Sequence, residues 1–217
     1  MKIIKELRAK ATPERARVSQ SFFKTGPGEY GEGDRFLGVA MPETRAIVRA
    51  HKADWSLGAA QELLQSEWHE VRMAGAIMLV ELFKTQPKEV TEVYVSVLGQ
   101  VINNWDLVDV SAPYIFAEAP EALLKKLFTS SNLWERRAAI VGSWGRIKRG
   151  EPALIFEFAR GMCDDPRDLT HKATGWMLRE VGKRCGDEVL LEFLGEMGGR
   201  LPRTTVRYAM EILKKKK

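Results

Sequence analysis

A tryptophan and a carboxylate stand four residues apart in segment 103–109, which reads NNWDLVD. On an α-helix, residues i and i+4 project from one face, so Trp105 and Asp109 are expected to lie together. An aromatic ring attracts cations through its quadrupole, and a carboxylate attracts them through its charge. The pair therefore predicts a small site that stabilises a reacting centre as it becomes cationic. In the alternative interpretation, Trp105 belongs to the core and Asn103, Asn104 or Asp106 caps a helix.

Cleavage of a glycosidic bond is a reaction that such a site can promote, because its transition state resembles an oxocarbenium ion. Asp109 would stabilise the charge at the anomeric carbon or hold the attacking water. A base that already carries a positive charge departs as a neutral base, so no general acid is needed. The three histidines are scattered and form no His-Glu-x-x-His motif, so we expect no metal site and no cofactor.

Composition indicates a globular protein with a basic surface. The 217 residues are 45% hydrophobic and 29% charged, with a net charge of +5 and a pI of about 9.2. This balance suits a nucleic-acid binder, although many basic proteins bind nothing acidic. Cys163 and Cys185 lack the paired spacing of a zinc or redox site, which favours reduced thiols. No apolar run reaches the roughly 18 residues of a membrane span. We therefore expect a cytoplasmic, nucleoid-associated protein.

A degenerate repeat runs through the chain, in which a basic or polar pair precedes an alanine and a helical run. Its alanines lie 38, 26, 35 and 36 residues apart, at Ala74, Ala112, Ala138, Ala173 and Ala209. Periods of this size with two helices each are typical of helical solenoids. Chance similarity is the alternative, since arginine and alanine are common in helices.

The repeat predicts an all-α fold, a right-handed α-α superhelix of HEAT- or armadillo-like helical repeats. We expect residues 1–217 to form one such domain, with helical patterns separated by glycine and proline. The second helix of each repeat would line a concave face. The residues just before the repeat alanines would then point into that face: Arg72, Asp109, Arg136, Arg137, Lys172 and Arg207.

Segment 22–34 departs from the helical pattern, because four glycines and a proline preclude a regular helix there. It also lacks the Gly-Lys-Ser/Thr ending of a phosphate-binding loop. An ordered surface loop with a function and a flexible connection are both compatible with this composition.

Three motifs together resemble the AlkD-type family of DNA alkylation repair glycosylases. They are the Trp-Asp-x-Val-Asp motif at 105–109, LWERRAAI at 133–140 and KATGWMLRE at 172–180. The segments FLGV at 36–39 and PETR at 42–45 are also similar, so the resemblance covers roughly residues 22–208.

The resemblance implies a HEAT-like fold and the cofactor-free removal of positively charged alkylated purines such as 3-methyladenine and 7-methylguanine from DNA. It implies catalytic roles for Asp109, Trp105, Trp176 and Arg137. It also places Phe22 where the family has a tyrosine that helps to hold DNA, so the hydroxyl is absent here. We expect the DNA-binding residues to be Phe22, Arg72, Arg136, Lys172, Arg179 and Arg207.

Two functional hypotheses follow. In the first, the chain is a monomeric glycosylase that acts on double-stranded DNA with alkylated bases, in base excision repair. In the second, it is a non-catalytic HEAT-like module that binds DNA, RNA or an acidic protein, since a solenoid fold does not itself imply an activity. A carboxylate repels a phosphate backbone, so Asp109 on a basic face favours catalysis. Arg137 and Trp176 also have structural alternatives, as a solenoid arginine and as a contact to the next repeat.

Overall fold

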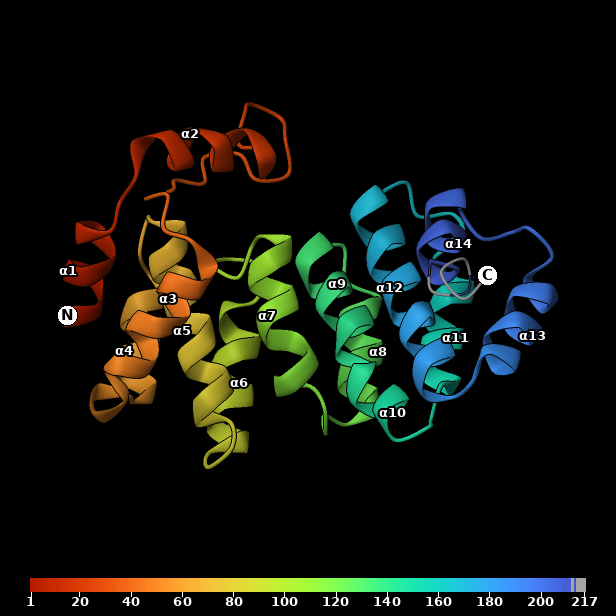
Figure 1. Ribbon diagram of the computed structural model, residues 1–217. Coiled ribbons are helices and arrows are strands. Elements are labelled where there is room, and N and C mark those ends of the chain that lie inside the picture. Colours follow the sequence, from red (N-terminus) through yellow and green to blue (C-terminus); the bar gives the residue numbers. More distant parts are fainter. Residues whose placement is uncertain (212, 214–217) are drawn as a thin grey trace. The chain divides into compact units, whose positions relative to one another are not determined.

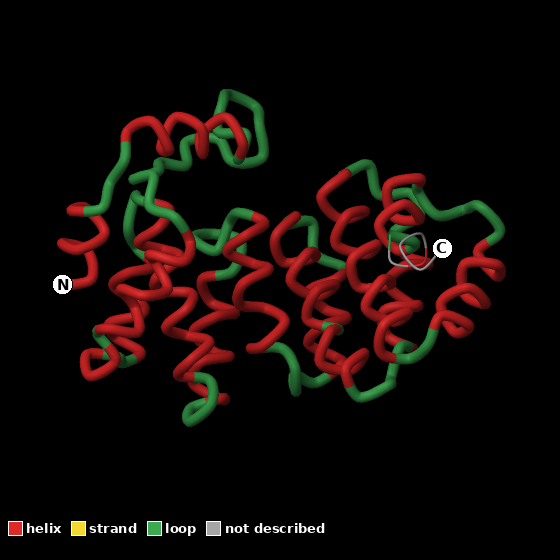
Figure 2. The backbone as a smooth tube through the Cα atoms, in the orientation of Figure 1, coloured by secondary structure: helices red, strands yellow, loops and turns green. Residues whose placement is uncertain are grey.

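The computed structural model describes residues 1–211 and 213. These residues form α-helices joined by mostly short connections, except for segment 23–40 between α2 and α3, with one 3₁₀ helix and two isolated β-bridges in place of a sheet (Figures 1 and 2). The predicted all-α class of helical repeats is confirmed. None of the described helices is long and apolar enough to cross a membrane.

The chain divides into two compact units, Met1–Ser111 and Ala112–Lys217. The expectation of one domain over residues 1–217 stays a prediction. The first unit contains the helices α1 (Lys2–Ala9), α2 (Pro13–Phe22), α3 (Met41–Ala50), η1 (Lys52–Asp54), α4 (Leu57–Leu64), α5 (His69–Leu82) and α6 (Pro87–Val97). Helix α7 (Trp105–Ile115) begins in the first unit and ends in the second.

The second unit continues with the helices α8 (Glu121–Phe128), α9 (Leu133–Gly142), α10 (Trp144–Lys148), α11 (Ala153–Gly161), α12 (Asp168–Arg184), α13 (Asp187–Met197) and α14 (Arg203–Ala209). Within this unit, α12 packs against α9, α10, α11, α13 and α14. It therefore forms the centre of the second core.

Helix α5 forms the centre of the first core, because it is buried on nearly all sides, is mostly apolar after its first turn, and packs against α1, α3, α4 and α6. The stripe Val71, Ala74, Met78 and Leu82, which the sequence predicts to be helical, is buried along it. A helix that is apolar all round is stable only when neighbours cover every side.

The repeat alanines are all buried, each in a different helix. Ala74, Ala112, Ala138, Ala173 and Ala209 are at most 1% exposed and lie in α5, α7, α9, α12 and α14. Each of these helices follows another helix in the chain. The five members of the sequence repeat therefore lie in five different helices, each with its alanine in the interior.

Helix α2 differs from the other α-helices because none of its residues is buried. Its start is held at Gly38, which has a φ of 80° and whose Cβ would lie 2.2 Å from the Thr12 carbonyl oxygen. The Thr12 amide also donates to the Leu37 carbonyl. Glycine at position 38 thus lets α2 lie directly against segment 35–40, which leads into α3.

Candidate active site

Helix α7 begins at Trp105 and carries Asp109 one turn further on. The Asn104 side-chain oxygen accepts a hydrogen bond from the Trp105 amide at 2.8 Å, so it satisfies a donor that the helix start leaves unpaired. Leu107 and Val108 are fully buried on the neighbouring side. Trp105 and Asp109 are both partly exposed, so they share a face as predicted, and Trp105 is not wholly a core residue.

An aromatic cluster brings Phe22, at the end of α2, against Trp105. The two rings meet edge to face at 5.9 Å, and Phe23 stacks on Trp105 at 5.2 Å and 17°. Phe22 is 62% exposed, so most of its ring faces solvent despite these contacts. Two residues that the sequence assigns to DNA and to catalysis are thus in contact.

The glycine-rich segment 22–34 is an ordered loop that closes on itself. The Gly31 amide donates to the Lys24 carbonyl at 3.0 Å, and the Gly33 amide donates to the Thr25 carbonyl at 3.3 Å. A Cβ at Gly31 would lie 2.4 Å from the Phe23 carbonyl oxygen, so no larger residue fits there. The loop thereby fixes the position of Phe23 at its start and of Asp34 at its end.

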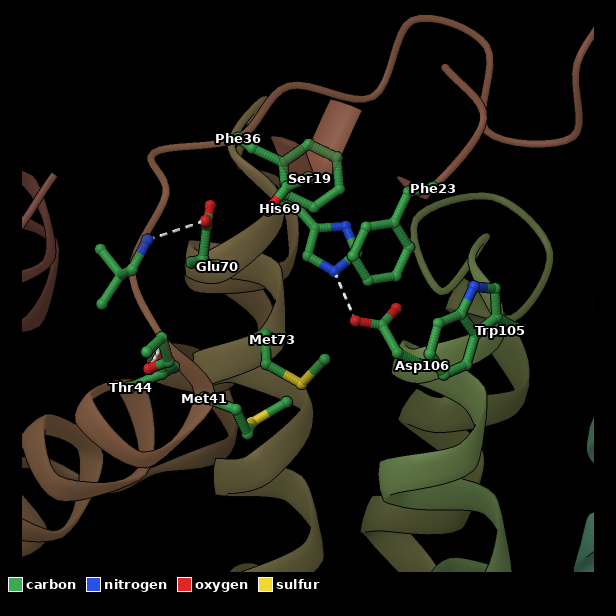
Figure 3. Close-up of a pocket in the computed structure, with 12 residues that line it drawn as sticks. Ser19, Phe23, Phe36, Met41, Thr44, His69, Glu70, Met73, Trp105 and Asp106 are labelled. Atoms are coloured by element: carbon green, nitrogen blue, oxygen red, sulfur yellow. Dashed lines mark hydrogen bonds and ion pairs between the residues drawn. The ribbon is translucent and has the colours of Figure 1, made fainter. Parts of the chain in front are cut away.

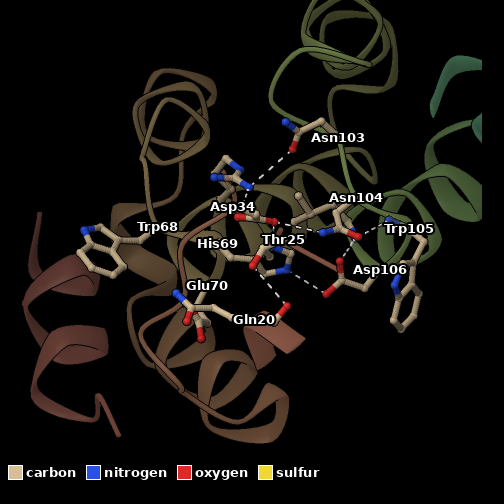
Figure 4. Close-up of polar contacts among 12 residues, drawn as sticks. Gln20, Thr25, Asp34, Trp68, His69, Glu70, Asn103, Asn104, Trp105 and Asp106 are labelled. Carbon is tan, nitrogen blue, oxygen red and sulfur yellow. Dashed lines mark hydrogen bonds and ion pairs between the residues drawn. The ribbon is translucent and has the colours of Figure 1, made fainter. Parts of the chain in front are cut away.

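A buried ionic network, which the sequence does not predict, lies beside Trp105 (Figure 4). His69, 3% exposed, has its Nδ1 2.7 Å from an Asp34 oxygen and its Nε2 2.9 Å from an Asp106 oxygen. Arg72 and Asn104 also donate to Asp34, at 2.8 and 3.0 Å. We call Asp34, His69, Arg72, Asn104 and Asp106 the histidine network. It joins the loop, the start of α5 and the start of α7.

The network shifts the pKa values of His69 and Asp34 in opposite directions. Burial alone would lower the pKa of His69, but the carboxylates of Asp106 and Asp34 raise that pKa to about 9. Burial alone would raise the pKa of Asp34, but His69, Arg72 and Asn104 lower it to about 2. At neutral pH the network therefore contains an imidazolium between two carboxylates.

The stability of the protein should consequently fall in alkali. A histidine with a raised folded-state pKa stabilises the fold fully below its ordinary value of 6.5 and loses this contribution as pH rises through about 9. The loss is on the order of 3 kcal/mol. We expect urea unfolding between these pH values to show this fall in the wild type but not in His69→Gln. Parallel pH profiles for the two proteins would contradict the assignment.

A pocket of about 380 Å³ opens beside the network (Figure 3). Its walls include the rings of Phe23, Phe36 and Trp105 and the side chains of Met41 and Met73. Glu70 borders it as a buried carboxylate that accepts the amides of segment 37–39 at 2.8–3.1 Å. These three bonds anchor the segment that α2 covers.

Arg137 and Trp176 belong to the second unit. The Asn132 side chain caps the start of α9, and Arg137, one turn later, is buried and donates to the Leu169 carbonyl. Trp176 lies on α12 and is partly exposed. The four-residue catalytic set stays a prediction, and of its members the structure shows Trp105 and Asp109 one turn apart on α7.

The basic residues assigned to DNA differ in their surroundings. The expectation for Arg72 is wrong, because this side chain is buried and donates to Asp34 and to the carbonyls of Val101 and Ser66. Arg136 is partly exposed and bound to Asp165 and to the Ser130 carbonyl. It therefore helps to hold the segment before α12.

The other three basic residues lie in the second unit, at or near the surface. Lys172 pairs with Asp168 at 2.7 Å, and Arg179 pairs with Glu211. Arg207 is exposed and lies 5.7 Å from the Tyr208 ring. Their assignment to DNA stays a prediction.

Comparisons with known proteins agree with this architecture. A family model described as DNA alkylation repair enzyme matches residues 3–213. A solved structure described as a predicted DNA alkylation repair enzyme from Enterococcus faecalis is similar, with a TM-score of 0.73 and 18% identity. The match covers 93% of this chain and 95% of that chain. No curated protein sequence matches significantly.

Proposed function

The chain belongs to the DNA alkylation repair enzyme family, and we propose that within it the protein is a glycosylase for positively charged alkylated purines. The observation that carries the proposal is the first turn of α7, where Trp105 and Asp109 are both partly exposed and one helical turn apart. Exposed Phe22 lies against the same tryptophan.

In the proposed reaction, the bond between C1′ of the sugar and the nitrogen of the alkylated base breaks. The bonding electrons leave with the base, which becomes neutral, and positive charge develops at the sugar. Asp109 stabilises this charge electrostatically, and the indole of Trp105 faces the same cation. Water then adds to C1′ and releases a proton to solvent, so no metal or cofactor takes part.

The proposed substrate is double-stranded DNA, and the protein would act on it as a monomer. We expect it to be cytoplasmic and associated with the nucleoid. Phe22 would lie against the sugar-phosphate backbone or the bases through its exposed ring. Arg137 and Trp176 keep the catalytic roles that the family resemblance implies for them, and Lys172, Arg179 and Arg207 would contact phosphates.

Incubation with methylated genomic DNA and chromatography of the released bases tests this proposal. We expect 3-methyladenine, 7-methylguanine or both to appear at rates above the enzyme-free blank. DNA binding without any released base would instead support the non-catalytic HEAT-like module.

Replacement of either tryptophan should separate activity from stability. We expect Trp105→Ala and Trp176→Ala to lower base release while the proteins stay folded, because both side chains are partly exposed. Loss of a fully buried tryptophan would cost about 3–5 kcal/mol instead. Thermal unfolding and the excision rate should be measured on the same samples.

Two other partly exposed tryptophans serve as matched controls, Trp55 in the first unit and Trp144 in the second. Their alanine variants should keep the excision rate. A large loss of melting temperature in Trp105→Ala, with normal activity per folded molecule, would favour a packing role for Trp105.

A further inference from the structure

The residues on either side of Trp105 both belong to the histidine network. Asn104 accepts the Trp105 amide through Oδ1 and donates to Asp34 through Nδ2. Asp106 accepts the Leu107 amide through Oδ1 at 2.8 Å and pairs with His69 through Oδ2. The backbone that carries the indole is therefore held from both sides by residues outside α7.

The ring of His69 supports the indole by a second route. One ring contact is with Phe36, at 4.4 Å and 22°, and another is with Phe23, at 5.2 Å and 38°. Phe23 in turn stacks on Trp105. His69 thus reaches Trp105 through hydrogen bonds on one side and through packed rings on the other.

Both contacts of the imidazole require it to donate. Ionised carboxylates accept hydrogen bonds only, so two ring nitrogens facing two carboxylates must both carry protons. A neutral imidazole has one donor and would turn a lone pair toward Asp34 or Asp106. Loss of the proton therefore replaces the attraction between His69 and one of these two carboxylates by a repulsion.

The charged groups around His69 come from three segments. Asp34 faces it from the loop, Asp106 from α7, and Arg72 balances Asp34 from one turn along α5. Glu70 borders the same pocket, with its oxygens occupied by the amides of segment 37–39. His69 is thus the member of this group whose ordinary pKa lies nearest neutrality, and its ionisation controls the contact between His69 and Asp106 on α7.

We propose that His69 is a positioning residue for the active site, because its doubly donating imidazolium fixes the first turn of α7 and the orientation of the Trp105 indole. His69 is too buried to touch DNA, so it acts through Trp105. The consequence for base release rests on the proposed glycosylase function, whereas the consequence for the indole does not. Base release should fall as pH rises through deprotonation of His69, with little change in DNA affinity.

Three variants separate positioning from mere structural support. His69→Gln retains one donor and should lower the single-turnover excision rate about 10-fold to 100-fold, since small misplacements at a reacting centre are costly. Adding Asp106→Asn supplies an amide donor to the glutamine oxygen and restores both hydrogen bonds without charge. This double variant should recover most of the rate and lose the alkaline fall. His51→Gln, which removes another carboxylate-paired histidine, should behave as the wild type.

The test combines excision rates with a direct reading of Trp105. The protein is labelled with 5-fluorotryptophan, and the fluorine resonance of Trp105 is assigned by its loss in Trp105→Phe. Both the resonance and the excision rate are followed from about pH 6.5 to about pH 10, with enzyme-free blanks. In the wild type we expect the resonance to shift and the rate to fall with one common midpoint. The double variant should show neither change.

The outcomes distinguish the two proposals. A Trp105 resonance that is indifferent to pH, in a wild type that excises bases, overturns positioning by His69 and leaves the glycosylase intact. A resonance that follows His69, in a protein that releases no base at any pH, supports positioning and overturns the glycosylase. The pH titration uses the wild type, so the test stands even where His69→Gln does not fold.

Discussion

Replacement of Asp109 by asparagine is expected to lower the single-turnover rate of base release by about 10²–10³ while DNA affinity is kept. The exchange preserves size and shape and removes only the negative charge. A carboxylate that stabilises an oxocarbenium-like centre interacts far more strongly with the transition state than with the bound substrate. The effect should therefore appear in the chemical step.

The measurement is single-turnover release of alkylated base from duplex DNA at saturating enzyme, with affinity measured separately on undamaged DNA. Affinity should stay equal or rise, because a charge that repels phosphates has been removed. Near-wild-type release by Asp109→Asn would refute the role of this carboxylate. Asp106 is a poor substitute for that role, because its oxygens are already bound to His69 and to the Leu107 amide.

Replacement of Asp34 by asparagine is expected to destabilise the fold by about 3–5 kcal/mol at neutral pH. Asp34 accepts hydrogen bonds from His69, Arg72 and Asn104, so the variant leaves two buried cations without their shared counterion. Removal of one member of a buried ionic group is costly, because the remaining charges stay desolvated.

Urea unfolding at neutral pH measures this loss, and Asp54→Asn is the matched control. Asp54 is half exposed and 3.6 Å from its histidine partner, so its loss should change stability by less than about 1 kcal/mol. Because the folded-state pKa of Asp34 is lowered, its carboxylate stabilises the fold fully above its ordinary pKa of 3.8. This contribution is lost as pH falls through about 2. The acid dependence of the wild type in this range should be absent in Asp34→Asn. Equal stability of the two variants would contradict the network.

The helices and their repeat could be predicted from the sequence, because both depend on near neighbours in the chain. The stripe from Val71 to Leu82 is buried along α5, and the five repeat alanines are buried in five helices. Helix α2 could not be predicted in this way, because it has no buried face and its sequence therefore shows no helical period of apolar residues.

The sequence by itself also determined that Trp105 and Asp109 share a helix face, since positions four apart on a helix are adjacent whatever surrounds it. Only the tertiary structure decided that His69 pairs with Asp34 and Asp106, which lie 35 and 37 positions away. It also decided that Arg72 is a buried partner of Asp34 instead of a phosphate contact. A charged side chain follows no period of its own. Whether it faces solvent or a counterion depends on which distant segments the packed helices and the glycine-rich loop bring beside it.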